Sequence, residues 1–198
     1  PSRWHLAALA GISAAMLGFE ILLLRLFEFS HWHYFAGFAI ALALLGMGAA
    51  GTTLALFSRR ALQWGDRWFL AALLVMAAGL LLVLILQSRL ALSPLFAAWD
   101  SGELSKLLLV DLAAFVPFYG AGLAIGQTFM RWPRYTARLY ACNLFGSGAG
   151  AVLASLLLWG LQVETALVLM ALALLLLGLS LAWAQRQIAL AGLCLLVF

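Results

Sequence analysis

Long apolar runs separated by short polar connections make up most of the chain. A bilayer core of about 30 Å requires roughly 20 apolar residues per helix, and six runs reach that length. Each run is continuously apolar, whereas a membrane-spanning strand alternates polar and apolar positions. A seventh run begins near the C-terminus and is too short to span. We expect an all-α, polytopic transmembrane helical bundle of one domain, residues 1–198, with spans at 6–29, 34–57, 69–87, 104–130, 139–160, 163–183 and, incomplete, 188–198.

The composition excludes a water-soluble domain. Hydrophobic residues make up 67% of the chain and charged residues 9%. A soluble domain of this length needs more charge to cover its surface. The lipid bilayer is therefore the first expected partner.

The basic residues predict the orientation. When the two sides are alternated through the helices, one side receives most of the 11 basic residues, and cytoplasmic loops collect Lys and Arg. The N-terminus and the connections 58–68, 131–138 and 184–187 are therefore expected to be cytoplasmic. Because these residues are spread over short loops, nucleic-acid binding is not needed to explain the net charge of +4. They are Arg3, Arg59, Arg60, Arg67, Arg131, Arg134, Arg138 and Arg186.

Glycines at a spacing of four residues predict close helix packing. Gly122 and Gly126 lie in the fourth span, and Gly146 and Gly150 lie in the fifth. Small residues at this spacing let helix backbones approach closely, so we expect the fourth and fifth spans to pack tightly together. The first two spans carry similar pairs, Gly11 with Ala15 and Gly46 with Ala50, which are candidates for the same close contact between those two spans.

Ionisable groups within the spans are candidate functional residues, because each costs at least ~2.5 kcal/mol to insert. Glu20 lies deepest, and Arg25 and Glu28 can pair at i, i+3. Together with Asp111 and His31, Arg25 and Glu28 are expected near the outer leaflet, where they can form one polar cluster. Such a cluster suits a cation or proton path or a polar ligand site. The structural alternative is an ion pair with side chains that reach the interface.

The remaining polar candidates lie at the interfaces. His31 and His33 are two residues apart and share no helix face, so we predict no metal site and no cofactor. An interfacial turn is the favoured interpretation of this segment. Arg138 and Tyr140 are interpreted as helix anchors, and Asn143 can hydrogen-bond to another helix. No sequence motif for a soluble active site is present.

Several segments carry a family resemblance. They read Gly18-Phe-Glu20-Ile-Leu-Leu-Leu-Arg25, Leu44-Leu-Gly46-Met-Gly48-Ala-Ala-Gly51, Val116-Pro117-Phe118, Gly120-Ala-Gly122 and Arg138-Leu-Tyr140-Ala-Cys-Asn143-Leu-Phe-Gly146-Ser-Gly148-Ala-Gly150. Over most of 10–160, the chain resembles the membrane-embedded N-terminal region of bacterial spermidine-synthase-like proteins, the fused transporter/spermidine synthases.

The resemblance implies a place in the bacterial inner membrane and a cytoplasmic aminopropyltransferase-type domain after the helices. Such a domain uses decarboxylated S-adenosylmethionine and a polyamine, and its catalytic residues are not among residues 1–198. We therefore expect the chain to belong to a longer product. Its role would be to anchor that domain or to dock a partner. The family's polar positions carry over to Glu20, Arg25, Arg138, Tyr140 and Asn143.

Two other functions remain open. The glycines and aromatic residues also suit an accessory subunit of a larger respiratory or photosynthetic membrane complex. A small transporter of a cationic solute, with Glu20 and Asp111 along its path, is the other alternative. Co-purification at fixed stoichiometry would favour the first, and loss of transport in Glu20→Gln would favour the second.

Overall fold

The chain is all-α in the computed structural model, which describes residues 1–31, 36–90 and 100–184, with the side chains of 28–31, 36 and 182–184 left out. The elements are α1 (Arg3–His31), α2 (Ala36–Leu56), α3 (Ser58–Trp64), α4 (Asp66–Arg89), α5 (Ser101–Arg131), the 3-10 turn η3 (Pro133–Tyr135), α6 (Thr136–Gly160) and α7 (Val163–Ala184). Apart from α3 and η3, these helices are long and apolar enough to cross a membrane. The six expected spans are confirmed, and the expected seventh lies outside the described residues.

The short helix α3 was not expected from the sequence, which indicated only a connection at 58–68. The helix ends at Trp64 and is followed by Gly65, whose backbone N–H donates to the Ala61 carbonyl at 3.2 Å. Gly65 has φ of +48°, a region that side chains other than glycine rarely adopt. The glycine turns the chain directly from α3 into α4.

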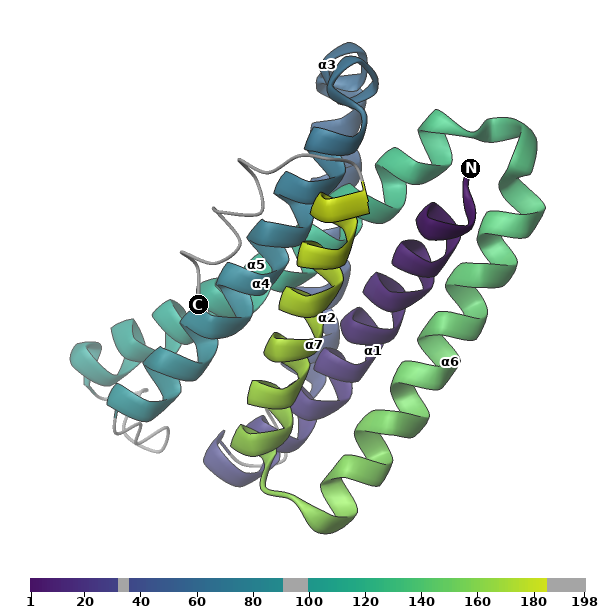
Figure 1. Cartoon of the computed structure of the whole chain (residues 1–198). Helices are drawn as coiled ribbons and strands as arrows, with labels where there is room; N and C mark the ends of the chain where they lie inside the picture. The colour runs from purple at the N-terminus through teal and green to yellow at the C-terminus, as the bar shows by residue number, and fades with distance from the viewer. Residues whose placement is uncertain (32–35, 91–99, 185–198) are drawn as a thin grey trace.

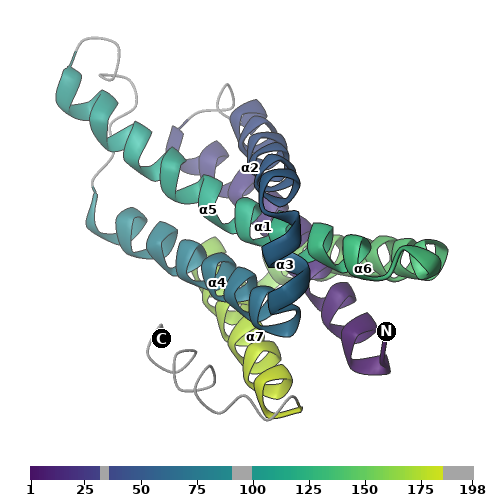
Figure 2. The same cartoon turned by 90° about the horizontal axis from the view of Figure 1, so that it is seen from above.

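The helices are arranged around α1. This helix packs against α2, α5, α6 and α7, whereas α4 packs mainly against α5 and α7. Figure 1 shows α6 at one edge of the bundle, lying along α1. Seen from above, the α4–α5 pair and α6 extend in opposite directions from α1 (Figure 2). Most of the contacts that hold the bundle together therefore involve α1 or α5.

The two ends of the bundle differ in the number of basic residues that they carry. The N-terminus, α3 and the connection between α5 and α6 lie together at one end (Figure 1), which we call the basic end; it comprises 1–5, 57–67 and 131–138. The opposite end, called the far end, contains the α6–α7 connection and the start of α5. The basic end is the one that the charge distribution predicts to be cytoplasmic.

The closest helix contact joins α1 and α6 through glycine. A Cβ atom placed on Gly150 would lie 2.5 Å from the Cα of Ala14, and one on Gly146 would lie 2.7 Å from the Cα of Ala10. These distances leave no room for a side chain. Within lipid, small residues allow the close van der Waals contact that holds helices together.

The glycines of α5 face a different helix from the one expected. A Cβ on Gly122 would lie 2.7 Å from the Cβ of Ala50, and one on Gly126 would lie 2.5 Å from Leu54. Both partners belong to α2, and Gly46 of α2 packs in turn on Phe118 of α5. The expected tight packing between α5 and α6 is therefore wrong, because their glycine faces are used on α2 and α1 respectively.

The expected small-residue contact between the first two helices is also replaced. Gly11 of α1 faces Leu177 of α7, and Gly46 and Ala50 face α5. The i, i+4 spacing identifies a face that accepts close approach. It does not identify the partner, since every such face is chemically alike.

A reciprocal contact joins α4 and α5. A Cβ on Gly120 of α5 would lie 2.5 Å from the backbone nitrogen of Met76, and one on Gly79 of α4 would lie 2.6 Å from the Cδ of Pro117. Gly79 thus accommodates the proline ring within α5. The two glycines lie on opposite sides of the same interface, so neither helix can rotate without a clash.

We predict that Gly150→Ala destabilises the bundle by about 1–3 kcal/mol, because the new methyl group meets the α1 backbone in a filled interface. Gly148→Ala is the matched control, since a Cβ there has no neighbour within 4 Å. Thermal unfolding in detergent, followed by tryptophan fluorescence, should show a lower Tm for the first variant only. Equal Tm values for the two variants would contradict the assigned α1–α6 contact.

Candidate functional site

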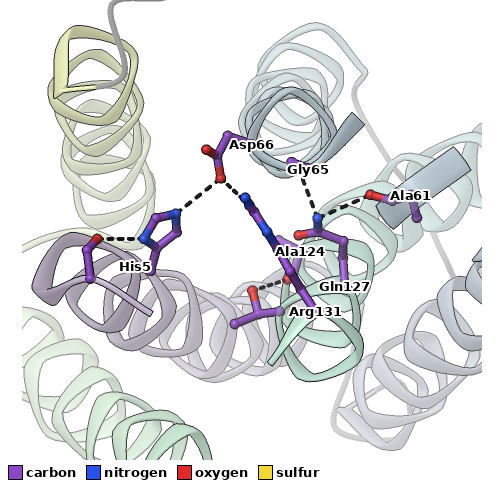
Figure 3. A network of polar contacts seen from close by, with 9 residues as sticks. His5, Ala61, Gly65, Asp66, Ala124, Gln127 and Arg131 are labelled. Atoms are coloured by element: carbon purple, nitrogen blue, oxygen red, sulfur yellow. Dashed lines mark hydrogen bonds and ion pairs between the residues drawn. The ribbon is translucent and has the colours of Figure 1, made fainter. Parts of the chain in front are cut away.

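A connected set of polar contacts joins α1, α4 and α5 at the basic end (Figure 3). Asp66 Oδ1 lies 3.1 Å from His5 Nε2 and also accepts a hydrogen bond from Arg131 Nη1. On its other side, His5 Nδ1 lies 2.6 Å from Ser2 Oγ. The Trp132 ring packs edge-on against His5 at 4.7 Å, and the Arg131 guanidinium lies 4.6 Å from the same ring. We call His5, Asp66, Arg131 and Trp132 the latch.

The latch links three helices through one carboxylate. Asp66 is the first residue of α4, where a negative charge interacts favourably with the helix dipole. The side chains of His5, Asp66 and Arg131 are 20%, 27% and 29% exposed. At this exposure, solvent still screens the charges. The latch therefore orients the helix ends more than it stabilises the whole bundle.

Gln127 of α5 fixes the turn between α3 and α4. Its Nε2 donates to the carbonyl of Gly65 at 2.9 Å and to that of Ala61 at 3.3 Å (Figure 3). Gln127 is 1% exposed. A buried amide must be hydrogen-bonded to offset its desolvation, and these carbonyls supply the acceptors. Gly65 also makes room for Arg131, whose Cζ would lie 3.3 Å from a Cβ at position 65.

Two further hydrogen bonds cross between helices within the bundle. Ser13 Oγ of α1 donates to Asn143 Oδ1 of α6 at 2.7 Å. Thr53 Oγ1 of α2 lies 3.0 Å from the Tyr119 hydroxyl of α5. Both lie on interfaces that the glycines bring into close contact. Asn143, singled out from the sequence, therefore holds α6 on α1.

The structure places the two deep carboxylates on different helices. Glu20 lies half-buried on α1 beside Phe19, which packs on Phe118 of α5 with ring centroids 5.1 Å apart. Asp111 lies half-buried on α5. In the described part of the chain, neither carboxylate forms a hydrogen bond or an ion pair. Their roles stay a prediction.

The polar cluster expected near the outer leaflet is only partly described. Arg25 is exposed and lines a hollow at the far end together with Glu164. The side chains of Glu28 and His31 and the whole of His33 lie outside the described residues. A joint site of these groups with Asp111 therefore also stays a prediction.

The interfacial candidates of α6 point outward. Arg138 and Tyr140 are both exposed, Tyr140 by 59%. Neither is part of the latch. Their exposure fits either the anchoring interpretation or contact with a partner.

Neither the latch nor Gln127 was predicted from the sequence. A signal was present, because Asp66 is a lone acid among the arginines of 57–67. Such a carboxylate is expected to find a basic partner. The partner was not predictable, since Arg131 lies 65 positions away along the chain.

The chain is a multi-span helical membrane protein. In comparisons with known proteins, no family model, no curated protein and no solved structure matches it. Within the described residues, no group of three or more His, Cys, Asp or Glu side chains is placed to hold a metal ion.

We predict that Gln127→Leu lowers the free energy of unfolding by about 1–3 kcal/mol, because the Gly65 and Ala61 carbonyls lose a buried donor. Gln63→Leu, at an exposed position of α3, is the control and should change it little. Thermal unfolding in detergent tests both variants. A Tm for Gln127→Leu equal to that of the parent protein would show that these hydrogen bonds do not hold the turn.

Proposed function

We propose that the chain is a membrane anchor that holds a cytoplasmic domain or partner protein at its basic end. This is the role implied by its resemblance to the membrane region of spermidine-synthase-like proteins. The observation that carries the proposal is the asymmetry of the bundle. At the basic end, polar contacts connect three helices, and exposed basic side chains lie at the same end. That combination suits a platform for another protein better than a substrate path.

Hydrogen bonds hold the helix ends at the basic end in fixed relative positions. Asp66 connects α1 to α5 through His5 and Arg131. Gln127 of α5 donates a hydrogen bond to the Ala61 carbonyl of α3. A surface that docks a partner loses less entropy on binding when its elements are already fixed. The latch supplies that pre-organisation.

The positive charge of the basic end favours a partner with an acidic surface. Six exposed arginines lie at the basic end, and they are Arg3, Arg59, Arg60, Arg67, Arg134 and Arg138. Complementary charge sets the approach and orientation of a partner. In the predicted orientation, the same arginines face the cytoplasm, where an attached catalytic domain would lie.

A second function, an accessory subunit of a larger membrane complex, is favoured by α6. Its outward face carries exposed aromatic side chains, with Phe145 81% and Trp159 92% exposed. This face suits lipid and also suits a neighbouring membrane subunit. An accessory subunit would contact its partners through α6 within the membrane rather than through the basic end.

The experiment is to purify the native protein from its membrane in mild detergent and to measure the mass of the intact assembly. We expect a mass above the 21.3 kDa of these residues, with any separate partner cross-linked to the basic end. Arg59→Gln/Arg60→Gln should weaken retention of such a partner about tenfold. Arg89→Gln/Lys106→Gln, at the far end, removes the same charge and should leave retention unchanged.

Two results would oppose the anchor. A mass of 21.3 kDa without partners would overturn it. Partners at fixed stoichiometry that cross-link to α6, and are retained by both double variants, would instead establish the accessory-subunit function.

A further inference from the structure

We propose that the seam between α1, α6 and α7 binds one phospholipid, with an acyl chain in an apolar groove and an amine-bearing, zwitterionic headgroup at the far end. The inference is independent of the anchoring function. The proposed site comprises two surface hollows that lie along these three helices.

The first hollow is an apolar groove of about 340 Å³. Small residues line it from both α1 and α6, and they include Gly11, Ala14, Gly18 and Gly150. Where side chains are absent or short, the surface is left depressed between the larger residues of α7, such as Leu177. A flexible hydrocarbon chain fills a narrow apolar depression of this kind without desolvating any polar group.

The second hollow, of about 510 Å³, is polar. Arg25 of α1 contributes a cation, Glu164 of α7 an anion, and Gln162 an amide between α6 and α7. All three side chains are exposed. The hollow therefore offers opposite charges side by side at the end of the bundle where a headgroup layer would lie.

Helix geometry aligns the two hollows. Gly11, Gly18 and Arg25 are spaced by seven residues, so they lie on one face of α1. At 1.5 Å per residue, Arg25 lies about 10 Å beyond Gly18 and about 21 Å beyond Gly11. Half of a bilayer core is about 15 Å thick. An acyl chain whose headgroup sits beside Arg25 thus enters the groove next to Gly18.

The charges select the headgroup. A guanidinium binds phosphate oxygens through paired, charge-assisted hydrogen bonds. Arg25 has another interaction within the protein, but a guanidinium carries five donors and can serve both groups. The Glu164 carboxylate matches the ammonium of an ethanolamine headgroup, and it would repel an anionic headgroup without an amine. We therefore assign the site to phosphatidylethanolamine rather than phosphatidylglycerol.

The test uses the whole purified chain with phosphatidylethanolamine and phosphatidylglycerol supplied in equal amounts, and counts retained lipids by native mass spectrometry. We expect one retained lipid per chain, predominantly phosphatidylethanolamine. Ala173→Leu places a larger side chain at an exposed position in the groove and should reduce retention about tenfold. Arg25→Gln should do the same, because it removes charge-assisted hydrogen bonds to phosphate.

Glu164→Gln separates headgroup recognition from acyl-chain binding. The variant should keep one lipid and lose the preference for phosphatidylethanolamine. Ala55→Leu, at an exposed position of α2 away from the seam, is the control and should behave as the parent protein. Equal retention of both lipids by the parent protein, unchanged retention in Ala173→Leu, or a lipid-free dimer would each overturn the proposal.

Discussion

Close backbone contact between helices is the constraint on which the rest of the bundle depends. Lipid tails are as apolar as leucine, so burying apolar side chains provides little drive to bring helices together within a membrane. Van der Waals contact must supply it, and that contact is best where no side chain intervenes. Gly150 on Ala14, Gly122 on Ala50 and Gly120 on Met76 are contacts of this kind. Each contact restricts the relative motion of two helices.

The position of α1 follows from these contacts. Its small residues accept α6 on one side, and its large buried residues, such as Phe19, pack towards α5 on the other. Two different surfaces on one helix allow it to occupy the centre. By contrast, α6 uses one small-residue face, and the rest of its surface remains available to lipid or to a partner.

The polar contacts of Gln127 and the latch lie at the basic end of the bundle. At the basic end, Gln127 donates to the carbonyls of Ala61 and Gly65, and the latch connects α1, α4 and α5. The arginines around this region remain exposed. At the far end, Arg25 of α1 and Glu164 of α7 line a polar hollow. The exposed arginines and the latch therefore support a docking role for the basic end, and the hollow supports lipid binding at the far end.

The sequence by itself determined the fold class and the six spans, because continuous apolar runs of bilayer length admit only one kind of backbone structure in lipid. It also identified the glycine faces and Asn143, because spacing and polarity are local properties. Only the tertiary structure decided which helices those faces meet, replacing the expected α5–α6 contact with α2–α5 and α1–α6. It also brought Asp66 to His5 and Arg131 across the bundle. Small-residue faces are interchangeable in sequence, and partners remote along the chain meet only when the relative positions of all the helices are set.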